Sequence, residues 1–96
     1  MTTNTTALDE MKTIMMALSR LDERGVPVTF DELMASQMTG TPAADALIRE
    51  AWRTFITQQV NGEAVRAELP LEDNARIFGL TAIGREAIAR WGKILS

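Results

Sequence analysis

The sequence predicts a mainly α-helical domain with a small β-hairpin, in the order helix, helix, helix, hairpin, helix. Apolar residues recur at spacings of three and four along most of the chain, which is the pattern of amphipathic helices. The segment 63–80 instead combines alternation, turn residues and β-branched or aromatic residues, which favours two short strands. With 96 residues, 46% of them hydrophobic, we expect a single domain over 7–96 after a flexible tail at 1–6.

The first two helices are bounded by residues that start or stop helical structure. The first is expected over 7–24, because Gly25 and Pro27 end it. The second begins after Thr29, which forms a capping box with Glu32: each side chain can bond the backbone N–H of the other residue.

The third helix, expected over 41–60, has the clearest apolar stripe. Thr41 and Pro42 are typical starting residues, and Asn61-Gly62 is a typical end. We therefore expect Trp52 to be buried rather than to serve as an interface anchor. The stripe consists of Ala44, Leu47, Ile48, Ala51, Trp52, Phe55, Ile56 and Val60.

Two structures suit the first half of the segment expected to form the hairpin. Strands are expected at 63–69 and 76–80, joined by the turn residues of 70–74. Alanine and glutamate also suit helices, so a helix over 63–69 is the alternative. Thr81 is expected to cap the last helix, whose apolar face is Ile83, Ala87, Ile88, Trp91 and Leu95.

Composition excludes several classes of function. The chain has no cysteine and no histidine, which removes disulfides, thiolate nucleophiles, the usual zinc sites and imidazole catalysis. It has no Gly-rich phosphate loop either. We expect a protein that is not an enzyme and that uses no cofactor or metal. No apolar run approaches the ~20 residues of a membrane span and no signal peptide is visible, so a cytoplasmic protein is expected.

Two stretches resemble the winged helix-turn-helix domain of MarR-like and PadR-like bacterial regulators. The first, VTFDELM at 28–34, is similar to the family's hydrophobic-Thr-x-x-Glu-Leu start of the helix before the turn. The second, FGLTAIGREAI at 78–88, is similar to its aromatic-x-Leu-Thr-x-x-Gly-Arg-x-x-aliphatic passage from wing to last helix. The resemblance covers about residues 26–90 and implies a winged helix-turn-helix fold.

The resemblance also implies a transcription regulator that binds duplex DNA. The helix at 41–60 would enter a major groove as the recognition helix, and the hairpin at 63–80 would lie along the backbone as a wing. A homodimer would supply two such helices, with Trp91 and Leu95 as the candidate dimer face. Matching outer positions of the third helix are Thr41, Ala43, Asp45, Ala46, Arg49 and Arg53. The candidate DNA contacts are Thr41, Ala43, Arg49 and Arg53 on that helix, with Arg66 and Arg76 in the hairpin.

The two arginines of the third helix have two explanations, a contact with DNA and ion pairing on the helix surface. Arg49 and Arg53 lie one turn apart, so they could donate to a guanine edge and a phosphate. Alternatively, Arg49 pairs with Asp45 and with Glu50 along an ordinary solvated helix surface, which is the more common role of a charged helix face.

The charge of the chain favours a second hypothesis from a different class. The formal net charge is -3, whereas Lys and Arg supply most of the affinity of proteins for DNA. The alternative is an acidic winged-helix interaction module, such as a phage- or mobile-element-type inhibitor or antirepressor (anti-CRISPR-like), that docks on a basic nucleic-acid-binding protein. Its candidate contacts are Asp31, Glu32, Glu68, Glu72 and Asp73.

Overall fold

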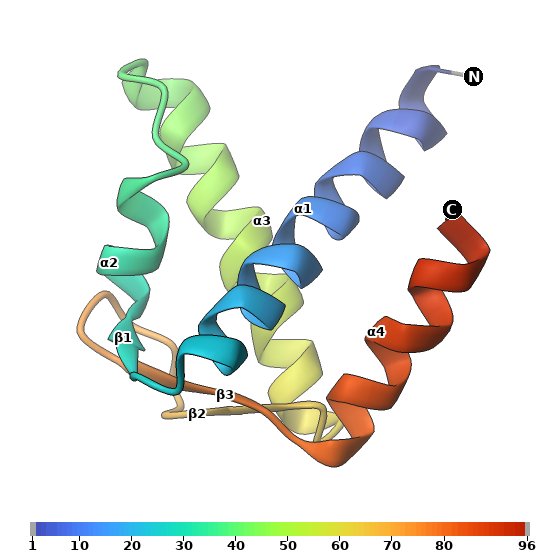
Figure 1. Ribbon diagram of the computed structural model, residues 1–96. Helices are drawn as coiled ribbons and strands as arrows, with labels where there is room; N and C mark the ends of the chain where they lie inside the picture. The colour runs from blue at the N-terminus through green and yellow to red at the C-terminus, as the bar shows by residue number, and fades with distance from the viewer. Residues whose placement is uncertain (1, 96) are drawn as a thin grey trace.

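A computed structural model describes the backbone of residues 2–95 and the side chains of residues 10–90. The helices are α1 (Thr2–Arg24), α2 (Phe30–Ala35), α3 (Pro42–Asn61) and α4 (Ala82–Leu95). Figure 1 shows a small sheet at the base of the molecule, from which α1 and α4 extend so that the first turns of α1 and the last turns of α4 lie on the same side. The mainly helical architecture with a small sheet is as expected.

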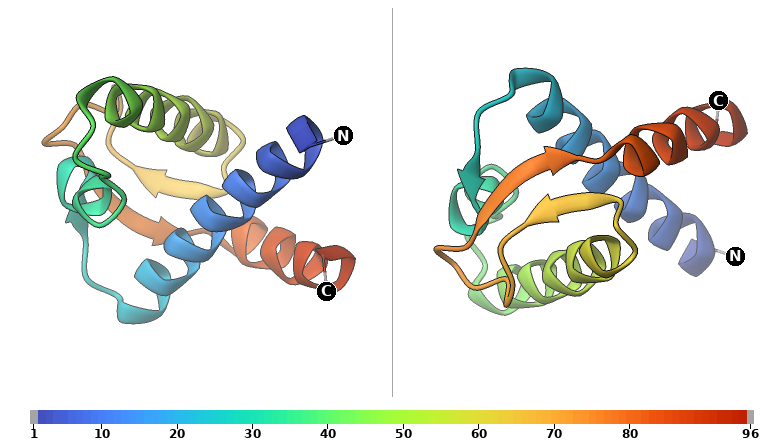
Figure 2. Two further views of the ribbon diagram at one scale, coloured as in Figure 1. Left: turned by 90° about the horizontal axis from the view of Figure 1, so that it is seen from above. Right: turned by 90° about the horizontal axis from the view of Figure 1, so that it is seen from below.

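The sheet has three antiparallel strands, β1 (Val28–Thr29), β2 (Val65–Ala67) and β3 (Arg76–Leu80), in the order β1-β3-β2. Val65 pairs with Leu80, and an irregularity follows before Ala67 pairs with Ile77. The predicted hairpin is therefore confirmed, and the helical alternative for 63–69 is wrong. Figure 2 shows the three strands from below. The two-residue strand β1 was not expected, because only its pairing with the distant β3 makes it a strand.

One hydrophobic core joins the helices to the sheet. Its fully buried members come from every layer: Leu18 of α1, Phe30 and Met34 of α2, Ile56 of α3 and Ile77 of β3. Trp52 is buried as expected. Burying a side chain of this size contributes roughly 1.5–3 kcal/mol, so these contacts dominate the stability of the domain.

Two expectations about the helices were wrong. The helix α1 begins at Thr2 rather than Ala7, and so includes most of the segment expected to be a tail. Leu47 and Ala51, both assigned to the buried stripe of α3, are exposed, and the exposed fraction of Leu47 is 74%. At 100° per residue, Leu47 lies about 140° around the helix from Trp52, which places it on the opposite side from the core.

The residues of both motif stretches form what we call joints, that is, side-chain or backbone contacts that hold one element of the fold against another. Thr29 and Glu32 make the predicted capping box, with N···O distances of 3.0 and 3.1 Å between each backbone nitrogen and the other side chain. At the start of α4, the Thr81 hydroxyl donates to the Glu63 carbonyl and accepts from the Gly84 backbone N–H. Gly84 packs so closely on the Ala64 carbonyl that a Cβ would lie 2.0 Å from its oxygen. These contacts fix the hairpin against α4.

A third joint links α1 to the same region. Asp22 accepts hydrogen bonds from the Leu80 backbone N–H at 3.0 Å and from Arg85 Nε at 2.8 Å. These donors lower the pKa of Asp22 to about 2, with the Arg85 hydrogen bond as the largest cause. Gly79 makes the approach possible, because a Cβ there would lie 2.8 Å from the Asp22 carboxylate.

Within the described part of the chain, no helix is both long and apolar enough to cross a bilayer.

Candidate interaction surface on α3 and the β2–β3 loop

The turn that leads into α3 is held by Asp45. Its carboxylate accepts from the Thr39 backbone N–H at 2.8 Å, the Thr39 hydroxyl at 2.7 Å and the Gly40 N–H at 3.1 Å. The Thr39 N–H is the main reason that the pKa of Asp45 lies below its usual value. Asp45 therefore turns back toward the chain and is not on the outer surface of the helix. Thr41 precedes the helix but makes no side-chain capping bond.

Arg49 is engaged on both sides by carboxylates. Its Nη1 lies 3.3 Å from Asp31 Oδ1 at the start of α2, and its Nη2 donates to Asp73 Oδ1 in the β2–β3 loop (residues 68–75). Its side chain is only 22% exposed, whereas those of Asp31 and Asp73 are 68% and 65% exposed. The expected Asp45–Arg49 pairing is wrong, because both carboxylate partners of Arg49 come from other elements.

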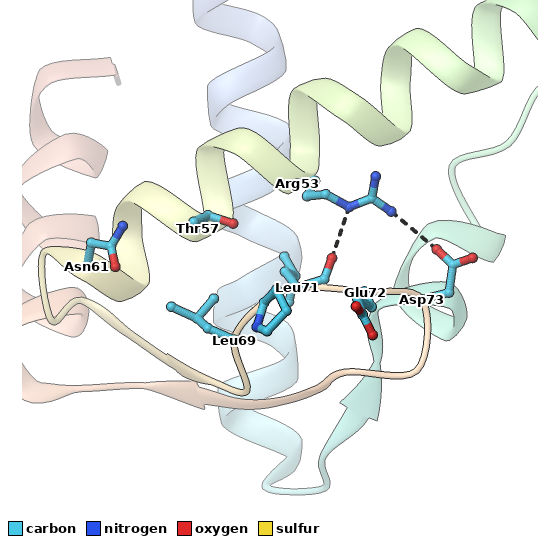
Figure 3. A pocket seen from close by; sticks show the side chains of 8 residues that line it. Arg53, Thr57, Asn61, Leu69, Leu71, Glu72 and Asp73 are labelled. Carbon is cyan, nitrogen blue, oxygen red and sulfur yellow. Dashed lines mark hydrogen bonds and ion pairs between the residues drawn. The ribbon is translucent and has the colours of Figure 1, made fainter.

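Arg53 repeats this arrangement one turn later. Its Nε donates to the Leu71 carbonyl at 2.9 Å and its Nη2 lies 3.2 Å from Asp73 Oδ1 (Figure 3). Arg53 also pairs with Glu50 at 3.5 Å, whereas the expected pairing of Arg49 with Glu50 is wrong. Both guanidinium groups also lie over the ring of Phe30, with the carbon of each group 5.5 Å (Arg49) and 5.0 Å (Arg53) from its centroid. The two arginines thus join α3 to α2 and to the β2–β3 loop.

The outer face of α3 is left without a cation. We define it as the exposed residues of the helix on the side away from the core: Ala43, Ala46, Leu47, Glu50, Ala51, Thr54 and Gln58. Arg49 and Arg53 are the only basic residues of α3, and both are turned from this face toward their partners. The face therefore combines Leu47 and three alanines with the uncharged polar side chains of Thr54 and Gln58, and Glu50 is its one charged residue.

The two hairpin arginines differ from each other. Arg76 is paired with Glu68, with 3.3 Å from Nε to Oε1, and Arg76 is the main cause of the lowered pKa of Glu68. The Arg76 guanidinium also lies 5.7 Å from the centre of the Phe78 ring. Arg66 is exposed on β2 and makes no ion pair within the described residues. Of the four arginines expected to contact DNA, three are thus held by internal carboxylates.

The acidic residues of the alternative hypothesis are mostly engaged as well. Asp31 and Asp73 pair with the α3 arginines, Glu68 pairs with Arg76, and Glu32 belongs to the capping box, whose Thr29 N–H is the main cause of its lowered pKa. Among these five, Glu72 alone has a carboxylate without a hydrogen-bond or ion-pair partner in the described part of the chain.

An open groove of about 620 Å³ separates the C-terminal half of α3 from the β2–β3 loop. Thr57 and Asn61 of α3 face it, and Leu69, Pro70 and Leu71 supply apolar surface from the loop (Figure 3). Arg53, Glu72 and Asp73 complete its lining. The groove can receive an apolar side chain from a partner, with carboxylates beside it.

Sequence reasoning missed Leu47 as a surface residue and Asp45 as the anchor of the turn. The angular position of Leu47 relative to Trp52 would have revealed the first. The candidate dimer residues Trp91 and Leu95 have side chains outside the described residues. No group of three Asp, Glu, His or Cys side chains placed to hold a metal ion occurs among the described residues.

No family model, curated protein or solved structure matches the chain at a significant level.

Proposed function

We propose that this is a winged-helix domain that binds another protein, and not duplex DNA, through the outer face of α3. The order of elements supports the fold assignment: α2, a tight turn and α3 are followed by the β2–β3 hairpin and α4, and β1 completes a sheet with the order β1-β3-β2. The two motif stretches support the fold and not the activity, since their Thr, Glu, Gly and Arg residues form joints inside the domain.

The observation that carries the proposal is the internal engagement of Arg49 and Arg53. Positioning on DNA needs cations that are free to contact phosphate oxygens. A phosphate near α3 would have to displace Asp31 and Asp73 from the arginines and then lie beside the released carboxylates. Lys12, Arg20, Arg24 and Arg66, which have no ion pair in the described part of the chain, lie on α1 and β2 instead.

The composition of the outer face favours a protein as the ligand. Leu47 projects from the rigid helix, with Ala43, Ala46 and Ala51 around it on the exposed side. An exposed helix face with one large apolar side chain among alanines resembles the surfaces that amphipathic helices offer to a partner's hydrophobic groove. Leu47 would be the anchor of such a contact.

Site-specific photo-crosslinking tests this proposal. A photoreactive amino acid is placed at Leu47 in the full chain and, as the matched control, at Ala89, an exposed position on α4. In cells that express the protein, irradiation should give an adduct at Leu47 but not at Ala89, and that adduct should resist nuclease and contain peptides of a second protein by mass spectrometry. An adduct sensitive to nuclease, or adducts at Ala89 alone, would contradict a protein-binding face on α3.

A further inference from the structure

We infer that the outer face of α3 and the adjacent groove take a cationic segment of a partner protein, in which aliphatic side chains are flanked by Lys or Arg. This inference rests on the proposed function and specifies the chemistry of the partner. It is argued from the exposure of the carboxylates, the distribution of net charge and the lining of the groove.

In the ion pairs around α3, the carboxylate side chains are more exposed to solvent than the arginine side chains. Asp31, Asp73 and Glu50 have side chains that are 68%, 65% and 70% exposed, whereas Arg49 and Arg53 beneath them are 22% and 35% exposed. A partner that approaches this surface therefore meets carboxylate oxygens before it meets a guanidinium group. The pairing fixes the positions of the carboxylates without removing them from the surface.

The net charge of the chain is concentrated here. We define the acidic rim as five exposed carboxylates of α2, α3 and the β2–β3 loop, namely Asp31, Glu32, Glu50, Glu72 and Asp73. The other two carboxylates of α3 and the loop are left out, because Asp45 bonds Thr39 and Gly40 and Glu68 pairs with Arg76. Together with Arg49 and Arg53 they give three net negative charges. The remaining eight acidic and eight basic residues of the chain cancel, so the net charge of the rim with its two arginines equals the formal charge of -3. Opposite charge on a partner would both speed its approach and fix its orientation.

The acidic rim adjoins both the outer face of α3 and the groove. Glu50 lies three positions after Leu47 on α3 and is linked through Arg53 to Asp73 at the groove. Inside the groove, exposed Leu69 and Pro70 can contact an aliphatic chain, and Thr57 and Asn61 can hydrogen-bond a peptide backbone. Glu72, whose carboxylate has no partner in the described part of the chain, lines the same groove and can bind a partner's cation.

The test uses two synthetic peptides as probes. They share one aliphatic centre of Leu and Ile residues, flanked by Lys and Arg in the first and by Glu in the second, and each carries a fluorophore. Titration with the full-length protein should show the cationic peptide binding at least about tenfold more tightly, with an affinity that falls as salt rises. Equal affinities, or no binding of either peptide, would overturn the inference.

Three variants assign the binding to this surface. Glu72→Lys and the uncharged Leu47→Ser should each weaken binding of the cationic peptide several-fold, and Glu23→Lys, the matched charge reversal on exposed α1, should leave that binding unchanged. Circular dichroism checks that each variant is folded. An equal loss in all three would mean non-specific attraction and overturn the inference. A stable dimer that Leu47→Ser dissociates, measured by sedimentation, would overturn it too, because a second copy would then occupy the face.

The two claims can fail separately. If the photoreactive group at Leu47 captures a protein but the two peptides bind equally, the protein-binding function stands and the cationic partner does not. If that adduct is nucleic acid, the proposed function itself fails.

Discussion

Asp73 joins the two arginines of α3 through a single carboxylate oxygen, which accepts from Nη2 of both Arg49 and Arg53. The same two guanidinium groups lie over the buried ring of Phe30. The contact ties α3 to the β2–β3 loop and thereby shapes the groove between them. Residues that would reach DNA in a recognition helix thus hold the domain together here.

The Arg49–Asp73 pair should contribute measurably to folding. We expect Arg49→Ala, Asp73→Ala and the double variant, compared by urea unfolding, to give a coupling energy of about 0.5–1 kcal/mol, because Arg49 is mostly buried although Asp73 is exposed. Glu72→Gln, next to Asp73 but without an ion pair in the described part of the chain, is the control and should change the stability by less than about 0.5 kcal/mol. Strictly additive single effects would argue against the pair.

Leu47 should be dispensable for folding. We expect Leu47→Ala to change the free energy of unfolding by less than about 0.5 kcal/mol, since the side chain is exposed and alanine favours helix. Ile56→Ala, on the buried side of the same helix, should cost about 2–5 kcal/mol. Chemical denaturation measures both. A comparable loss for the two variants would mean that Leu47 belongs to the core.

The Asp22 joint should make the domain sensitive to acid. The pKa of Asp22 is about 2 in the folded protein, compared with the ordinary 3.8 expected when unfolded. The carboxylate therefore stabilises the fold fully above about pH 4, and this contribution is lost as the pH falls from there through 2. We expect Asp22→Asn to be less stable than the wild type at pH 7, with the difference shrinking across that window in urea titrations.

The control for this pH dependence is the neighbouring Glu23, which is exposed and has no partner in the described part of the chain. Glu23→Gln should leave both the stability at pH 7 and its acid dependence close to those of the wild type. A constant difference between Asp22→Asn and the wild type from pH 7 to pH 2 would contradict the assigned role.

The joint at Gly84 should tolerate no side chain. We expect Gly84→Ala to destabilise the domain by about 1–3 kcal/mol, because its Cβ would overlap the Ala64 carbonyl. Gly62→Ala is a matched control: its backbone has φ of -83°, and the nearest atom to an added Cβ is 3.4 Å away. Its melting temperature should stay near that of the wild type. Equal melting temperatures for the two variants would refute the close contact.

Local signals in the sequence predicted local structure well. The capping box of Thr29 and Glu32 and the cap at Thr81 are confirmed, because the partners lie three residues apart and their chemistry alone determines the bonds. The hairpin is also confirmed, because its two strands are neighbours along the chain and the turn residues between them mark where the chain reverses. The strand β1 was missed because two residues carry no periodicity and only the distant Ile77 and Arg76 pair with them.

The candidate site was harder to predict because its interactions are not local. Arg49 finds Asp31 and Asp73 at sequence separations of 18 and 24 residues, and no pattern in the helix itself indicates either partner. From sequence, Arg49 on a helix surface is suited to a phosphate as well as to a carboxylate, and an ion pair is the more common outcome. Only the packing of α2 and the β2–β3 loop against α3 decides between them.

The most direct test of the central claim is a fluorescence anisotropy titration of a random-sequence DNA duplex with the purified protein at low salt. Non-specific DNA-binding proteins reach Kd values of roughly 10⁻⁴ to 10⁻⁶ M even at physiological salt. The engaged arginines and the cation-free outer face of α3 predict no binding within that range. Saturable binding that weakens steeply with salt, and is reduced by Arg49→Gln and Arg53→Gln, would contradict the account.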